Sequence, residues 1–201
     1  MPEETDQLEH AVTPLELFFD LVFAFAITQV TKLLTHEPNW HGVIRGLLVL
    51  AAIWWAWTGY AWLTSTLDVD EGGVRLMMLA TMAAMLGVAL AVPGAFKGDA
   101  RLFGFSYLLV RCMHVVLYAY ASRGDPDLLR ALLRLAPTEL LGASLIVVAG
   151  FLSGQARIAV WLVALAIDYI GPAVVDLGGW RIAPAHFAER HGLIVLIALG
   201  E

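Results

Sequence analysis

The chain has 201 residues, of which 60% are hydrophobic and only 15% are charged, and its mean hydropathy is +0.76. Soluble domains average about 45–50% apolar and about 25% charged residues, so this composition excludes a single water-soluble core and indicates a bundle surrounded by lipid. A net charge of −6 without a basic stripe argues against nucleic acid as a partner, and the single Cys112 excludes an internal disulfide and a cysteine-based metal site.

About seven apolar runs approach the ~20 residues that a membrane-spanning helix needs. We therefore predict an all-α, polytopic transmembrane helical bundle without β-sheet. The runs lie near residues 15–35, 43–64, 74–93, 102–121, 137–152, 157–177 and from 184 to the end. The last run would measure about 22 Å from His186 to Glu201 at ~1.5 Å per residue, which is short of a hydrocarbon core of ~30 Å. We expect this seventh helix to be unfinished.

The segments outside these runs are short. An acidic tail over 1–14 precedes one membrane domain over 15–201, and the tail lacks the Lys and Arg that begin a signal peptide. Residues 122–136 place two arginines one turn apart among leucines, which predicts a short amphipathic helix on the membrane surface, with a plain loop as the alternative. The fifth spanning helix is then expected to begin at Pro137. Lys and Arg are equally divided between the two membrane sides, so the positive-inside rule does not fix the orientation.

Several charged residues fall inside the apolar runs, where a charge at the bilayer centre costs at least ~2.5–3.5 kcal/mol. In the first run, Glu16 and Asp20 are four residues apart and share a helix face. In the fourth run, Arg111 and His114 lie near mid-depth on one stripe. Asp168 lies at the matching depth of the sixth run, so we expect it to pair with Arg111.

The sixth run also contains a proline. Pro172 has no N–H, so the carbonyl of Asp168, four residues earlier, loses its helical hydrogen bond. Interrupted helices of this kind are tolerated in membranes where they line a cavity. The sixth run therefore predicts a polar cavity beside Asp168.

Further polar residues gather at the membrane side where the chain begins. Those in the seventh run are His186, Glu189 and Arg190, and Arg190 is the expected counter-charge of Asp20 or Glu16. Counting the runs as alternately up and down adds Asp68, Asp70, Arg75, Glu139 and Asp176. The tryptophans that approach the same side are Trp54, Trp55, Trp57 and Trp62. We interpret the set as a polar vestibule with an aromatic collar, against the alternatives of ordinary helix-end charges and buried ion pairs.

The two end motifs resemble the bacterial low temperature requirement A family. They are LELFFDLVFAFAITQ at 15–29 and HFAERHGLIVLIALGE at 186–201, and between them WWAWTGYAW and LDVDEGGVR follow in the family's order. The resemblance implies a bacterial multi-pass membrane protein and brings no catalytic residues. Members of the family continue with Ser and further membrane helices where this sequence has its last residue, Glu201, so the resemblance implies the N-terminal part of a longer protein.

Two functions are in competition. The ionisable stripes favour a transporter or channel for a proton, a cation or a small polar solute. The alternative is a membrane-organising or lipid-interacting protein that supports growth at low temperature, in which buried charge pairs fix the helix packing.

An intramembrane enzyme is not expected. HExxH and GxSxG motifs are absent, and His186 and His191, five residues apart, do not share a helix face for zinc. A retinal-type receptor is disfavoured because the seventh run has no Lys. We expect location in the cytoplasmic membrane with the lipid bilayer as partner, no cofactor and no metal, and a homo-oligomer remains open.

Overall fold

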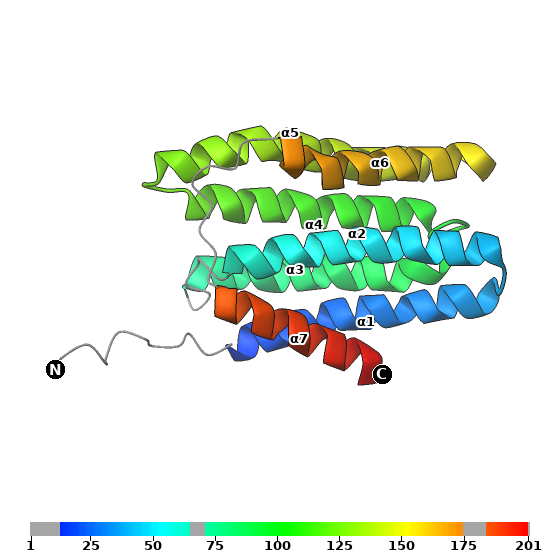
Figure 1. Cartoon of the computed structure of the whole chain (residues 1–201), viewed down its shortest axis with the longest axis horizontal. Coiled ribbons are helices and arrows are strands. Elements are labelled where there is room, and N and C mark those ends of the chain that lie inside the picture. Colours follow the sequence, from blue (N-terminus) through cyan, green and yellow to red (C-terminus); the bar gives the residue numbers. More distant parts are fainter. Residues whose placement is uncertain (1–12, 65–70, 175–183, 201) are drawn as a thin grey trace.

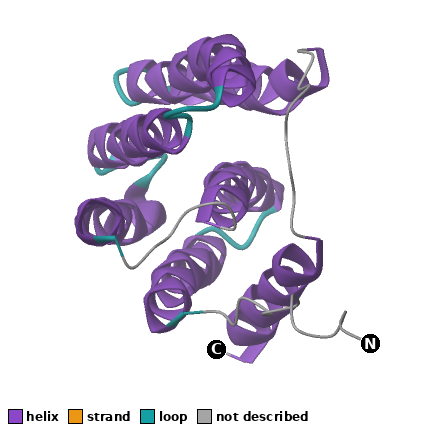
Figure 2. Ribbon diagram, turned by 90° about the vertical axis from the view of Figure 1, so that its left-hand side faces the viewer, coloured by secondary structure: helices purple, strands orange, loops and turns teal. Residues whose placement is uncertain are grey.

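The computed structural model describes residues 13–64, 71–174 and 184–200 (Figure 1). All regular elements in these ranges are helical, without a strand (Figure 2). In chain order they are α1 (Pro14–His36), α2 (Trp40–Thr64), α3 (Gly72–Ala91), the 3-10 turn η1 (Val92–Gly94), α4 (Ala100–Ala121), α5 (Pro126–Ala149), α6 (Gly154–Val174) and α7 (Pro184–Gly200). The prediction of an all-α polytopic bundle is confirmed.

The helices α1 to α6 are each long and apolar enough to cross a membrane. Their outer surfaces carry exposed aliphatic side chains such as Leu90 (70% exposed), Leu133 (65%) and Ile170 (58%). Such a surface is unfavourable in water and favourable in hydrocarbon. The protein is therefore a multi-pass membrane protein.

The prediction of a separate surface helix or loop over 122–136 is wrong. The structure has one continuous helix, α5, with Pro137 inside it rather than at its start. The N-terminus of α5 is capped by Asp125, whose Oδ1 accepts hydrogen bonds from two backbone N–H groups of the first turn. The leucine face that suggested a surface helix is buried in the bundle, at Leu132 and Leu135. Because α5 starts early, Glu139 lies near its middle and not at a helix end.

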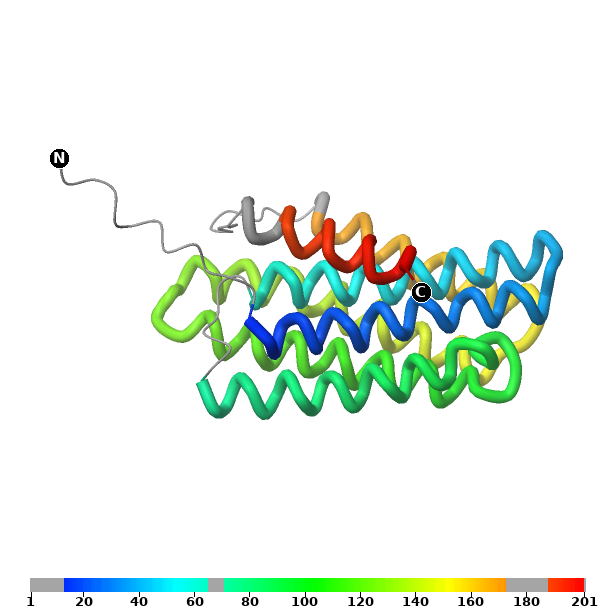
Figure 3. Tube along the Cα trace, turned by 90° about the horizontal axis from the view of Figure 1, so that it is seen from below, coloured from blue at the N-terminus to red at the C-terminus, as the bar shows by residue number. Residues whose placement is uncertain are grey.

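The helix α2 occupies the centre of the arrangement. It contacts α1, α4, α6 and α7, while the remaining neighbours follow around it as α1–α3, α3–α4, α4–α5 and α5–α6. The connections α1–α2, α3–α4 and α5–α6 lie at one end of the bundle, and the α4–α5 connection lies at the other (Figure 3). Because α2 has neighbours on several sides, it can supply side chains to more than one site.

Close packing of α4 on α5 depends on a glycine. A Cβ atom on Gly104 would lie 2.9 Å from the Cα atom of Val147 and 3.1 Å from the carbonyl oxygen of Ile146. Small residues at helix interfaces allow membrane helices to approach in this way. Gly104 lies seven residues before Arg111 on the same face of α4, so the close approach also brings Arg111 towards α5.

At the end of the bundle opposite Thr13, one carboxylate forms ion pairs that link two of the connections between helices. Glu37, between α1 and α2, lies 2.5 Å from Arg45 Nη1 and 2.9 Å from Lys97 Nζ, and Lys97 belongs to the connection between η1 and α4. The hydrogen bond from Lys97 lowers the pKa of the Glu37 carboxyl, against a smaller opposing effect of burial, and Arg45 lowers it further.

We predict that Gly104→Ala destabilises the bundle by ~1–3 kcal/mol, because the added methyl group meets backbone atoms that cannot turn away. Gly192→Ala is the control, since a Cβ atom there meets nothing within 4 Å and alanine favours a helix by up to about 1 kcal/mol over glycine. Thermal unfolding in detergent measures both. A Gly104→Ala variant that melts with the wild type would contradict the packing account.

A second prediction concerns pH. A carboxylate with a lowered pKa stabilises the folded state above its ordinary pKa, and the contribution disappears as the pH falls through the lowered value. The melting-temperature difference between wild type and Glu37→Gln should therefore be present at neutral pH and shrink below about pH 4. The exposed Asp127, which pairs with Arg130 on the surface of α5, supplies the control Asp127→Asn. A difference that stays constant down to acid pH would count against this role of Glu37.

Candidate functional site

The buried ionisable side chains of the bundle form two clusters, each built around one arginine. We name them the Arg190 cluster, with Glu16, Asp20, Thr64 and Arg190, and the Arg111 cluster, with Arg111, His114, Glu139 and Asp168. Apart from Thr64, the sequence analysis singled out all of these residues, but it placed Glu139 at a helix end. All eight are at most 5% exposed.

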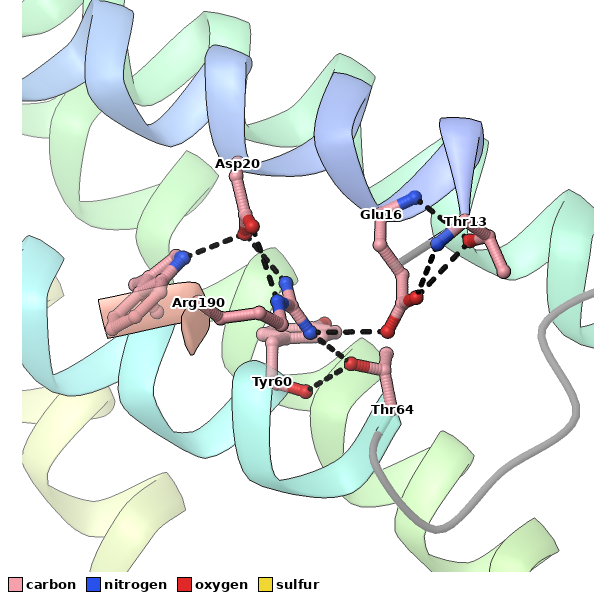
Figure 4. Close-up of polar contacts among 7 residues, drawn as sticks. Thr13, Glu16, Asp20, Tyr60, Thr64 and Arg190 are labelled. Atoms are coloured by element: carbon pink, nitrogen blue, oxygen red, sulfur yellow. Dashed lines mark hydrogen bonds and ion pairs between the residues drawn. The ribbon is translucent and has the colours of Figure 1, made fainter. Parts of the chain in front are cut away.

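In the Arg190 cluster, the guanidinium group of Arg190 on α7 binds the carboxylate of Asp20 on α1 (Figure 4). Arg190 Nη2 lies 2.5 Å from Asp20 Oδ1, and Arg190 Nε donates to Asp20 Oδ2 at 3.1 Å. The Nη1 group donates to Glu16 Oε1 at 3.3 Å and also to Thr64 Oγ1 of α2. This two-pronged geometry is the strongest arrangement that Arg makes with a carboxylate.

The acids of the Arg190 cluster have further partners. Trp57 of α2 donates its indole N–H to Asp20 Oδ1 at 2.8 Å. Glu16 Oε2 accepts the backbone N–H of Thr13 at 3.0 Å, as part of a capping box at the start of α1. The Arg190 cluster therefore joins α1, α2 and α7, and its charged groups all have hydrogen-bond partners. Such pairing is required of charges that stabilise helix packing, because an unpaired buried charge is strongly destabilising.

The prediction about Arg190 is confirmed, since it is the counter-charge of both Asp20 and Glu16. The helices that carry these residues, α1 and α7, are neighbours. Glu189 is exposed and the side chain of His186 lies outside the described part of the structure. One residue that the prediction left out, His191, packs its ring 4.6 Å from that of Trp57 and 5.9 Å from that of Trp54.

In the Arg111 cluster, three helices contribute charges near the middle of the bundle. Arg111 Nη2 of α4 lies 3.5 Å from Asp168 Oδ1 of α6, which confirms the pair predicted from matching depth. Arg111 Nε is closer, at 3.2 Å, to Glu139 Oε1 of α5. The same oxygen lies 2.6 Å from His114 Nδ1. Sequence reasoning missed Glu139 as a partner because Pro137 was taken as a helix start.

A cavity of about 170 Å³ opens onto this cluster. Four helices, α2, α4, α5 and α6, provide its walls. The lining residues are Trp55, Thr58, Gly59, Trp62, Arg111, His114, Leu135, Thr138, Glu139, Asp168 and Pro172. The volume exceeds the ~30 Å³ that a water molecule occupies in the liquid, so the cavity has room for several waters or one small solute.

The Arg111 cluster differs from the Arg190 cluster in its hydrogen bonding. Among the described residues, Arg111 Nε, His114 Nε2 and both carboxylate oxygens of Asp168 have no hydrogen-bond partner. Buried polar groups in proteins nearly always have one, and exceptions often mark binding sites. If His114 Nδ1 donates to Glu139, Nε2 of the neutral ring is an acceptor. The cavity thus presents three open acceptor atoms, two on Asp168 and one on His114, beside one open donor, Arg111 Nε.

Glycines make room for these groups. A Cβ atom on Gly142 of α5 would lie 2.6 Å from Asp168 Oδ1, and one on Gly59 of α2 would lie 3.2 Å from His114 Cε1 and Nε2. Neither the carboxylate nor the imidazole could keep its position beside a larger residue. The cavity-facing groups are thus held between small residues on neighbouring helices.

The expected single vestibule is divided by Tyr60 of α2. Its ring centroid lies 5.0 Å from that of Phe19, next to Asp20 in α1, and 5.0 Å from that of His114. The hydroxyl donates to the carbonyl of Val110 at 2.8 Å, which fixes the ring between the clusters. Other residues assigned to the vestibule, Asp68, Asp70 and Asp176, lie outside the described residues.

The four tryptophans of the expected collar are also divided. Trp54 and Trp57 lie beside His191 near the Arg190 cluster, and Trp55 and Trp62 line the cavity. Trp57 and Trp62 are buried inside the bundle, at 0% and 4% exposed, rather than at its surface. For residues 13–64, 71–174 and 184–200, no group of three or more His, Cys, Asp and Glu side chains could hold a metal ion.

Comparison with known proteins gives a family match. The model of the family described as bacterial low temperature requirement A protein (LtrA) matches residues 11–201. An uncharacterized protein of Rhizobium meliloti (strain 1021) is 34% identical over 209 residues. That match covers 99% of this chain and 51% of the relative, so the chain spans about half the length of the curated protein it matches. No solved structure matches the chain.

The geometry of the Arg190 cluster yields a stability prediction. Arg190→Met should destabilise the protein by ~3 kcal/mol, because two buried carboxylates lose their counter-charge. Arg190→Lys should recover only part of the loss, since an ammonium cannot reach Asp20, Glu16 and Thr64 with the geometry of the planar fork. The control is Arg130→Met, which breaks an exposed i,i+3 pair with Asp127 and should change stability by less than about 1 kcal/mol. Equal melting temperatures of the Arg190→Met and Arg130→Met variants would refute the tie.

Proposed function

We propose that this chain, which belongs to the bacterial low temperature requirement A family, lies in the bacterial cytoplasmic membrane as a multi-pass protein and moves a proton, a cation or a small polar solute. Because the chain spans about half the length of its relative, the activity of the whole protein is part of this proposal. The site of passage in the proposal is the cavity at the Arg111 cluster.

One observation carries the proposal. The cavity lies among membrane-spanning helices, and both oxygens of the buried Asp168 lack a hydrogen-bond partner there, within the described part of the chain. Ionisable groups inside a membrane are costly and commonly mark a pathway or relay. Pro172 lines the same cavity and removes the helical donor for the Asp168 carbonyl. An interrupted helix beside an ionisable group is typical of transporter binding sites.

The charges of the cluster favour a positively charged cargo. With both carboxylates ionised and His114 neutral, Glu139 and Asp168 outnumber Arg111 and leave one net negative charge in the interior. A cation or a proton at Asp168 neutralises it. Arg111 then holds the two carboxylates in place, and His114 Nδ1 contacts Glu139 at 2.6 Å.

The second candidate function is membrane organisation without transport or catalysis. The Arg190 cluster favours it, because its charges are paired in a way that joins three helices and requires no ligand. The same argument applies less well to the Arg111 cluster, whose acceptors are left open. We propose no catalytic step at either cluster.

Flux through the protein reconstituted in liposomes tests the proposal. A potassium gradient with valinomycin sets the membrane potential, and a dye inside the vesicles follows proton entry, while entry of labelled ethylammonium is followed separately. We expect flux above that of protein-free vesicles, and a loss of at least about tenfold in Asp168→Asn, because the neutral amide removes the net charge that attracts the cargo.

The control is Asp127→Asn, which removes an exposed carboxylate at the start of α5 and should leave the flux unchanged. Folded wild-type protein that passes neither protons nor ethylammonium would contradict the proposal and favour the membrane-organising role. Undiminished flux in Asp168→Asn would remove the Arg111 cluster from the pathway.

A further inference from the structure

Resting on the proposed function, we propose that the cavity binds a small protonated primary amine, whose ammonium group is held by Asp168. The inference names the ligand class of the site from three features of its walls: the number of open acceptors, the aromatic rings and the volume.

The open acceptors match the donors of an ammonium group. A primary ammonium carries three N–H donors and no acceptor. The cavity supplies Asp168 Oδ1, Asp168 Oδ2 and, in the tautomer with a proton on Nδ1, His114 Nε2, and none of these atoms has a hydrogen-bond partner among the described residues. Additional acceptor capacity comes from Thr58 and Thr138, whose hydroxyls donate to backbone carbonyls and keep their lone pairs.

The aromatic wall suits an organic cation. The rings of Trp55 and Trp62 line the cavity, and tryptophan is the aromatic side chain that attracts cations most strongly. Neighbouring rings hold both tryptophans in place. The ring centroid of Trp55 lies 4.5 Å from that of Tyr169, and Trp62 stacks on Tyr118 with a centroid distance of 5.3 Å. The alkyl part of an amine can contact Leu135 and Pro172 on the opposite walls.

An alkali metal ion fits these walls less well. Proteins that strip such ions of water surround them with rings of oxygen atoms. Here the side-chain oxygens at the cavity come from Asp168, Glu139, Thr58 and Thr138, and Glu139 is already engaged with Arg111 and His114. A cavity of about 170 Å³ has room for a short alkylammonium.

The bound amine and a proton compete for one carboxylate. The charged and titratable groups near Asp168 are Tyr107, Arg111 and His114 on α4, Glu139 on α5 and Tyr169 on its own helix. The α2 residues that line the cavity are uncharged. Only Asp168 and His114 have open acceptors among them. Lowering the pH should therefore weaken amine binding by protonating the Asp168 carboxylate, so the site would exchange an amine for a proton.

Calorimetric titration of the full protein in detergent with ethylammonium chloride tests the inference. We expect saturable binding that ethanol, a neutral molecule of similar shape, does not reproduce and that equal concentrations of sodium or potassium chloride do not displace. Asp168→Asn should weaken binding by about tenfold or more, as loss of a charged hydrogen-bond acceptor does. Asp127→Asn should bind like the wild type.

A second variant protects the test against misfolding of Asp168→Asn. Trp55→Leu should weaken binding of ethylammonium, whereas Trp55→Phe should retain most of it because the aromatic face remains. Absence of ethylammonium binding by the folded wild type, or its displacement by potassium as readily as by methylammonium, would overturn the inference. Proton flux in liposomes without amine binding would overturn the proposal of an amine ligand and leave the transport proposal standing. Amine binding without any flux would overturn the transport proposal alone.

Discussion

The structure depends on the cost of leaving a charge unpaired inside lipid. Arg111 and Arg190 are both buried between membrane helices, at 3% and 0% exposed, where an unpaired charge is costly. Each guanidinium therefore needs carboxylates from other helices, and this need joins α7 to α1 in one cluster and α4 to α5 and α6 in the other. The central helix α2 contributes to both sites, through Thr64 and Trp57 on one side and the cavity wall on the other.

The two clusters contain the same numbers of arginines and carboxylates but differ in how these groups are hydrogen-bonded. Each contains one arginine and two carboxylates, yet Asp20 is bound by Arg190 and Trp57. In the described part of the chain, Asp168 Oδ1 lies 3.5 Å from Arg111 Nη2, and neither Asp168 oxygen has a hydrogen-bond partner. Saturated partners make a rigid tie, and open acceptors beside a cavity make a binding site. Tyr60 packs between the clusters, with its ring next to Phe19 of α1 and His114 of α4.

The sequence contains enough information for the helices and for the two arginine pairs. Long apolar runs define α1 to α6, and matching depth in parallel helices predicts that Arg111 meets Asp168. Glu139 was misplaced because proline is compatible with both the first turn of a helix and its interior in a membrane. Burial of Leu132 and Leu135 decides between these, and burial is a property of the whole bundle. The cavity was anticipated beside Pro172, but its shape depends on approaches at Gly59 and Gly142 that no local pattern reveals.

Access of water to the Arg111 cluster is the central claim, and thiol accessibility measures it most directly. In a Cys112→Ser background, Thr58→Cys places a thiol on the cavity wall and Leu162→Cys places one on the lipid-facing surface of α6, where the leucine is 53% exposed. Thiosulfonate reagents react with the thiolate, which forms only in contact with water. The account predicts that a small charged thiosulfonate modifies Thr58→Cys in liposomes and leaves Leu162→Cys unmodified. Equal lack of reaction at both positions would show a dry site and contradict it.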